Sequence, residues 1–560
     1  MDRIFSAGES AEPGELDPGV AAVLALLATP GAFVSLFLTD HYGSLILWLR
    51  GRPTSFDPYT MSSSDEYFFI VLAMAVAGAV AVWKWDRLVP GRRDYANLAP
   101  LPIAGSRIFF ANLVALALLA VVLSLDVNAV SSVLFPLVVC WQQSSNVFPE
   151  FLATHAITVV LASAFGFLAV FAVLGIFMAV LPYRVFRKVS VYARCGIVFL
   201  LMILFATSFS VPREMQRLGQ DSRAWMALPP PAWFLGFCQA LRGQKSPALV
   251  SLNDAAVVGL LGALLLSVAA YSLCYARCFA QRAETAATSP RGSARLTALA
   301  FRALDALFLR SPFQRAGYRF AFWTIFRSEE QAFALGGFLS LGIVLASQKL
   351  LLAVDKRPPH AANALPSAEL LSIPLILGFF LILGLWGVCA IPAPLRANWV
   401  FRFHLDPRTR ECAPLARKFI LTFVAPALVG LCFPVYAYFW GWRVGALHTA
   451  LIAIWCVLLM EGLLVGFRKI PFTCSLPKFK SHAIVNALVL ALVYLAFTSA
   501  TATIESWALS DPLWYIAFVP FLSGALFALY FWPKMMIEPD RRLLFEEQSV
   551  SVIEILNLGR

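Results

Sequence analysis

The sequence predicts an all-α, polytopic membrane protein with about twelve transmembrane helices, arranged as two six-helix halves. Three observations lead to this fold class. Of 560 residues, 60% are hydrophobic and only 14% are charged, and the mean hydropathy is +0.76. Long runs without charge recur along the chain, and the polar loops between them repeat in a similar order in each half. This composition excludes an ordinary soluble protein.

Each apolar run is long enough to satisfy its backbone hydrogen bonds internally while it crosses about 30 Å of hydrocarbon. The predicted spans are Val20–Asp40, Tyr67–Trp83, Ile108–Leu125, Phe151–Leu181, Gly196–Ser210, Ala255–Phe279, Gln331–Ser347, Leu370–Ile391, Phe419–Phe439, Val444–Phe467, Ala483–Ala500 and Leu513–Trp532.

A polar interval rich in alanine, serine and arginine divides the spans into two sets. The predicted organisation is therefore an N-terminal tail at 1–19, a first half at 20–279, a linker at 280–330, a second half at 331–532 and a C-terminal tail at 533–560. The chain opens with the acidic "ESAEPGELDPG", which is unlike a cleaved signal peptide. We expect this start to be retained.

Basic residues predict the orientation, because lysine and arginine in short loops resist translocation. Most of the 44 basic residues lie in alternate loops and in the two tails. This places both termini in the cytoplasm of a multi-pass protein. The net charge of +12 is then a bias toward the cytoplasmic face, in contact with membrane lipids, and not a nucleic-acid site.

Catalytic and metal-binding signatures are missing from the sequence. It contains no phosphate-binding GxxxxGK[ST] loop, no HExxH, no GxSxG and no GxGxxG. The ten cysteines lie mostly in or beside apolar spans and do not suggest a disulfide framework or a metal site. We therefore expect no catalytic residue, no metal and no cofactor on this chain, and no enzyme activity of its own.

Ionisable residues inside the spans are few, and each is a functional candidate because a charge in hydrocarbon is costly. They are His155, His448 and Glu461. The two histidines fall near the outer ends of their spans, where a satisfied interfacial histidine is the simpler interpretation. Glu461 lies about two turns from Arg468, so it could snorkel or pair with a basic loop residue. This small number argues against a proton-coupled secondary transporter.

The cytoplasmic loop "RRDYANLAPLP" is suited to docking into a groove of a partner protein. Asp94 can cap a short helix that the following prolines end, and Tyr95 and Leu98 then share one face. Arg92 and Arg93 supply charge-assisted contacts beside that face.

A matching loop, "RANWVFRFHL", occurs in the second half and offers Trp399, Arg402 and Phe403. The alternative for both loops is an interfacial belt, since tyrosine and tryptophan favour lipid headgroups and arginine anchors to anionic lipid. Their matched positions favour docking.

The long outer segment 211–253 contains "ALPPPAWFLGF". Its prolines stiffen the entry, and Trp233, Phe234 and Phe237 predict an apolar helical or re-entrant face. We interpret this segment as a cap on the exit side, with a gate or a simple headgroup-level helix as the alternatives.

The motif order resembles that of bacterial ABC-exporter permease-like proteins, which are duplicated relatives of the type-two ATP-binding-cassette export permeases. It runs from "RRDYANLAPLPIAGSRIF" and "LPYRVFRKVS" through "LPPPAWFLGFCQALRG" and "RAGYRFAFWTIFRSEEQ" to "IPAPLRANWVFR" and "RKIPFTCSLPKFKSH". The resemblance covers nearly the whole chain. It implies a permease subunit in the bacterial inner membrane that exports an unidentified substrate.

The same resemblance implies that separate ABC-type ATPase subunits in the cytoplasm supply the energy and dock on the two matched loops. Type-two permeases usually have six spans per chain and pair, so the apparent fusion of both halves leaves a homodimer in question. Two other classes stay open: an integral membrane enzyme of lipid or glycan chemistry, and a secondary transporter.

Overall fold

The structure is a computed structural model. It describes residues 62–88, 104–140, 147–208, 229–281, 294–355, 366–393, 411–474 and 483–510, except 245 and 466, together with residues 31, 102, 211, 401, 520, 523, 524, 527, 528 and 544. These described parts are almost entirely helical and contain no strand.

Ten of the described helical segments are long and apolar enough to cross a membrane, which makes the chain a multi-pass membrane protein. They are Ser63–Trp85, Gly105–Cys140, Phe148–Val180, Val189–Ala206, Pro247–Tyr275, Glu329–Ala353, Ala368–Val388, Cys412–Trp440, Trp442–Leu463 and Val489–Leu509. Each overlaps one predicted span, from the second to the eleventh. The first and twelfth predicted spans lie almost wholly outside the described residues, so the total of twelve stays a prediction.

The chain forms two compact units, Met1–Thr288 and Ser289–Arg560, each described here by itself. The boundary falls inside the predicted linker. Unit 1 contains α6 (Ser63–Leu88), α8 (Gly105–Ala129), α9 (Ser131–Cys140), α10 (Val147–Val180), α11 (Tyr183–Ala206), α14 (Pro230–Leu241) and α15 (Pro247–Gln281).

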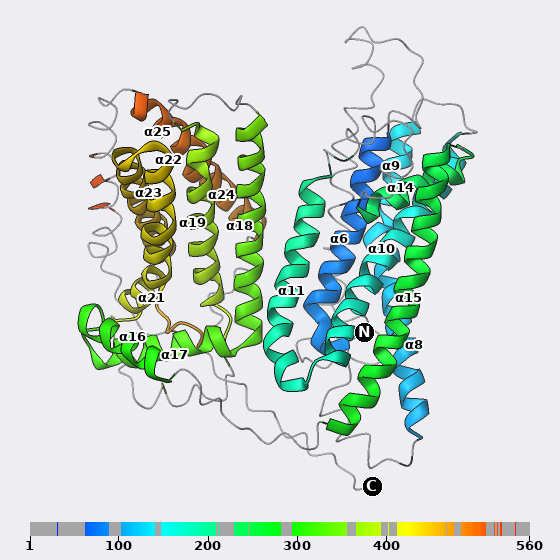
Figure 1. Cartoon of the computed structure of the whole chain (residues 1–560), viewed down its shortest axis with the longest axis horizontal. Coiled ribbons are helices and arrows are strands. Elements are labelled where there is room, and N and C mark those ends of the chain that lie inside the picture. Colours follow the sequence, from blue (N-terminus) through cyan, green and yellow to red (C-terminus); the bar gives the residue numbers. More distant parts are fainter. Residues whose placement is uncertain are drawn as a thin grey trace, which may run out of the picture. The chain divides into compact units, whose positions relative to one another are not determined.

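Helix α10 forms the centre of unit 1, where it packs along α6 on one side and α15 on another (Figure 1). Gly166 allows the close approach of α10 to α6, because a Cβ atom there would lie 2.7 Å from the carbonyl oxygen of Met74. At the end of α6 that contains its first turn, Phe69, Phe135 and Phe151 are fully buried in a shared apolar core.

Unit 2 is a second helical bundle with its own core. Its helices are α16 (Ala294–Leu307), α17 (Pro312–Arg327), α18 (Glu329–Asp355), α19 (Ala368–Val388), α21 (Cys412–Ala427), α22 (Phe433–Trp440), α23 (Trp442–Leu463), α24 (Ala483–Leu495) and α25 (Thr501–Ser510). Helices α16 and α17 lie across one end of the bundle, so much of the predicted linker is ordered helix (Figure 1).

A polar seam joins α17 to α21. The hydroxyl of Ser311, which caps α17 by accepting from the Gln314 backbone N–H, also donates to a carboxylate oxygen of Glu411 at the start of α21. Further along, Lys418 donates to the side chain of Gln314 at 2.5 Å. These successive side-chain bonds couple the two helices.

Two long helices of unit 2 contain π-helical turns. The turn η2 (Leu428–Cys432) separates α21 from α22, and η4 (Ala496–Ala500) separates α24 from α25. Pro426 precedes η2 and cannot donate a backbone hydrogen bond, which favours a local change in helical pitch. After α22 the chain reverses at Gly441, whose φ of 87° suits glycine.

A first prediction concerns the α6–α10 contact. Gly166→Ala would force a methyl group against backbone, and overpacking of this kind costs about 1–3 kcal/mol. Thermal unfolding of the protein in lipid nanodiscs should show a lower midpoint. Gly196→Ala is the matched control, because no heavy atom lies within 4 Å of its Cβ position. Equal midpoints for the two variants would contradict the close packing.

Candidate functional site

A buried ion pair lies at one end of unit 1, between α6 and α14. Arg242 at the end of α14 donates from Nη1 to Oε2 of Glu66 at 2.9 Å, and its Nη2 donates to Oε1 of the same carboxylate. The Glu66 side chain is fully buried and that of Arg242 is 1% exposed. This two-pronged geometry is the arrangement in which arginine binds a carboxylate most strongly.

Helix α10 completes this charge centre from a third side. Arg242 Nε donates to the hydroxyl of Thr154 at 3.0 Å, and the guanidinium lies 4.2 Å from the ring centroid of Phe151. His155 Nδ1 lies 3.4 Å from Glu66 Oε1. Through these contacts the guanidinium faces other protein groups. Its charge is therefore held away from lipid.

Aromatic rings enclose His155. Its ring centroid is 4.9 Å from that of Phe135, 5.9 Å from that of Phe69 and 6.4 Å from that of Phe151. The imidazole is fully buried. The structure places this histidine inside an aromatic core beside a carboxylate, and its level in the membrane stays a prediction.

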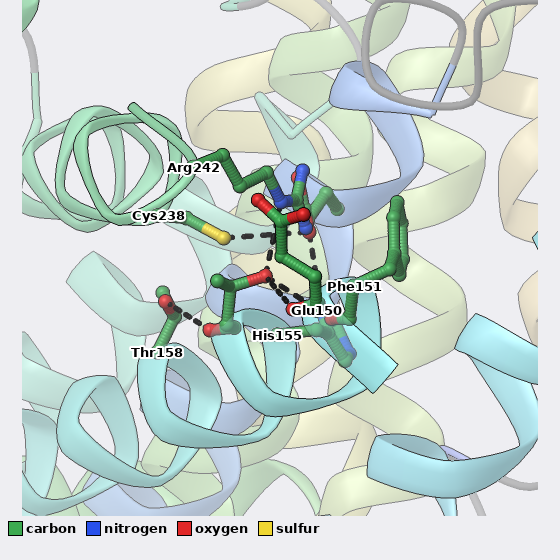
Figure 2. Close-up of polar contacts among 8 residues, drawn as sticks. Glu150, Phe151, His155, Thr158, Cys238 and Arg242 are labelled. Atoms are coloured by element: carbon green, nitrogen blue, oxygen red, sulfur yellow. Dashed lines mark hydrogen bonds and ion pairs between the residues drawn. The ribbon is translucent and has the colours of Figure 1, made fainter. Parts of the chain in front are cut away.

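Cys238 contributes a thiol to the same centre. Its Sγ donates to Glu66 Oε1 at 3.5 Å, and Figure 2 shows it on α14 facing the helix that contains His155 and Thr158. Burial raises the pKa of the Cys238 thiol well above its ordinary value, with the nearby Glu66 carboxylate acting in the same direction. The thiol is the hydrogen-bond donor in this contact.

The short helix α14 is the predicted outer cap, and the structure shows it as a regular helix that begins with prolines in its first turn. Phe234 is 1% exposed and packs against Phe165 with ring centroids 5.5 Å apart. Trp233 and Phe237 are partly buried against the same core. Helix α14 thus packs on α6, α10 and α15, and Arg242 ties its last residue to α6.

Unit 2 buries the other two predicted polar residues. His448 Nδ1 lies 2.7 Å from Oε1 of Glu505, and both side chains are fully buried. Glu461 accepts from Nη2 of Arg417 at 2.7 Å. Its partner Arg417 is on α21, in the basic stretch just before the span predicted to begin at Phe419.

The two matched loops lie outside the described residues. This applies to Arg92, Arg93, Asp94, Tyr95, Leu98, Trp399, Arg402 and Phe403. Phe401, which stands between Trp399 and Arg402 in the second loop, is described. Its ring packs against that of Phe320 of α17 at a centroid distance of 5.1 Å. One apolar side chain of the second loop therefore faces the α16–α17 layer.

Sequence reasoning missed Glu66, Arg242 and Glu505. Glu66 stands one residue before the apolar run that begins at Tyr67, and Glu505 follows the run that ends at Ala500, so both were assigned to loops. Both residues lie within about two turns of a predicted span boundary, and such boundaries are uncertain by several residues. That closeness was the signal that could have placed them inside a span. Their pairing with distant residues was not readable from spacing.

The chemistry of the centre is electrostatic. Among the described residues no three histidine, cysteine, aspartate or glutamate side chains gather in a way that could hold a metal ion. The residues present can hold opposite charges in apolar surroundings and so fix α14 against two spans. No family model, curated protein or solved structure matches the chain.

A second prediction tests the ion pair. Glu66→Gln leaves the buried Arg242 without its carboxylate, and breaking a buried pair in this way costs about 3–5 kcal/mol. The double variant Glu66→Gln/Arg242→Gln removes both charges and should lose less. Chemical unfolding in nanodiscs measures both.

The control for this experiment is Asp305→Asn, which breaks an ion pair with the half-exposed Arg319 and should cost about 0–1 kcal/mol. If the double variant is less stable than the single variant, the two charges do not depend on each other.

Proposed function

We propose that the chain is the transmembrane permease subunit of an ATP-binding-cassette exporter in a bacterial inner membrane, energised by separate ATPase subunits. The observation that carries the proposal is α14: a short apolar helix between two spans that does not itself qualify as a span and is tied by Arg242 to α6. A helix held in this way is suited to closing one end of a transport path. The motif order along the chain supports the same class.

The α16–α17 layer, at one end of the second unit, also supports the proposal. A cytoplasmic ATPase must move transmembrane helices through parts that it can reach, and α17 is bonded to α21 by the polar seam. Phe401, within the second matched loop, contacts this layer. A force applied at that loop would therefore reach a membrane-spanning helix directly.

The buried His448–Glu505 and His155–Glu66 contacts favour a secondary transporter as the second candidate. Proton-coupled carriers use buried carboxylates and histidines, and the structure contains more of these than the predicted spans indicated. An integral membrane enzyme gains no comparable support from the described residues.

A third prediction separates these classes at the matched loops. Tyr95→Asp/Leu98→Asp should weaken binding of the partner ATPase that this proposal requires, because a docked apolar face would carry charges whose desolvation costs a few kcal/mol. Trp399→Asp/Phe403→Asp should have the same effect. Pull-down of the ATPase, normalised to the inserted permease, measures both.

Membrane insertion is the control in this experiment, since neither pair lies within a predicted span. Unchanged ATPase binding in both double variants, with altered membrane seating, would show that the loops are headgroup belts. Transport that persists without ATP and collapses when a proton gradient is dissipated would favour the secondary transporter.

A further inference from the structure

The His448–Glu505 pair differs from the ion pair of unit 1 in having no fixed cation among the residues that the structure describes. His448 belongs to α23 and Glu505 to α25, and the two are joined at 2.7 Å with both side chains fully buried. The remaining polar atoms, His448 Nε2 and Glu505 Oε2, are buried and make no hydrogen bond to the described residues. Among the described residues, no further hydrogen bond stabilises a charge on either of these two atoms.

Tyr436 of α22 covers the imidazole. The two ring centroids are 4.3 Å apart, and the Tyr436 hydroxyl donates to the carbonyl oxygen of Leu370 at 2.6 Å. This hydroxyl is thus committed to α19. It is not the hydrogen-bond partner of the pair.

The other titratable groups on the helices packed against the pair do not place a positive charge beside it. The described ones are Arg443, Cys456 and Glu461 on α23, Tyr436 and Tyr438 on α22, Cys432 on η2, Glu369 on α19, Tyr494 on α24, and Cys412, Arg417 and Lys418 on α21.

The cations among these groups are placed elsewhere. Arg443 is exposed beside Trp442, Arg417 pairs with Glu461, and Lys418 bonds to Gln314. No arginine or lysine in the described part of the chain forms an ion pair with Glu505.

The cost of an unbalanced buried charge then determines how many protons the pair binds. An imidazolium beside a carboxylate, or an imidazole beside a carboxylic acid, has one shared proton and no net charge. Losing that proton leaves one negative charge in apolar surroundings, and adding another leaves one positive charge, both of which are costly. In unit 1 the permanent charge of Arg242 fills this role for Glu66 without a proton.

We propose that His448 and Glu505 form a proton-binding site whose single bound proton holds α25 against α23. The proton is the ligand, and docking of α25 is what it controls. The π-helical turn η4 directly precedes α25, which gives this helix a change of pitch at which it can separate from the rest of its span.

The pH dependence follows from counting protons. When α25 separates and both groups meet water, histidine titrates near pH 6.5 and glutamate near pH 4.3. Above about pH 6.5 the open form holds no proton and the closed form holds one, so docking weakens by up to about tenfold per pH unit. Between these two values each form holds one proton and docking is constant.

The fourth prediction is measured by hydrogen exchange. The full chain in nanodiscs is exchanged over a pH series, and the opening constant of the peptide containing Glu505 is corrected for the intrinsic exchange rate. We expect this constant to rise with pH above about 6.5. Glu505→Gln should abolish that rise, because the amide cannot share the proton and the closed form then holds none that opening would release above pH 6.5. Asp305→Asn, which removes a carboxylate elsewhere in unit 2, should leave it unchanged.

His448→Gln provides an independent readout. Glu505 then holds the proton alone in the closed form, so the rise should begin near pH 4.3 and not near 6.5. This variant also decides the matter if Glu505→Gln fails to insert. A wild-type constant that is flat above pH 6.5, a rise that persists in Glu505→Gln, or an onset unmoved in His448→Gln would each overturn the proposal.

Discussion

The constraint on which this structure depends is the cost of a charge in apolar surroundings. A buried charge is stabilised by an opposite charge, by a shared proton or by hydrogen bonds to polar groups. Unit 1 meets this requirement with the guanidinium of Arg242 against Glu66, and unit 2 pairs Arg417 with Glu461. Each such pair joins different helices, so the rule that limits charge also determines which helices are bound together.

The buried carboxylates of Glu66, beside His155, and Glu505, beside His448, are stabilised in two different ways. Glu66 has a permanent cation within hydrogen-bond distance, together with a threonine and a thiol around it. Glu505 has, among the described side chains, only an imidazole beside it. In the first arrangement a permanent cation balances the carboxylate, whereas the second depends on a proton that can leave.

Periodicity and apolarity were sufficient to predict the helices but not their partners. Every candidate span in the described residues overlaps a predicted one, because a run of apolar residues long enough to cross a bilayer has few other solutions. The charge centre could not be predicted in the same way. Glu66 and Arg242 are separated by 176 positions, and nothing local to either residue indicates the other. His155 was identified as a candidate, yet its aromatic enclosure depends on tertiary packing.

The polar seam between α17 and α21 has a mechanical consequence for unit 2. Because Ser311 and Lys418 bond across it at separate points, α17 cannot slide along α21 without breaking both contacts, and the two helices act as one lever. The lever continues through η2 into α22, where Tyr436 rests on the imidazole of His448. A π-helical turn marks a change of helical pitch in that path. How far a displacement at the α16–α17 layer travels is then decided by whether η2 absorbs the motion or passes it to the far end of the bundle.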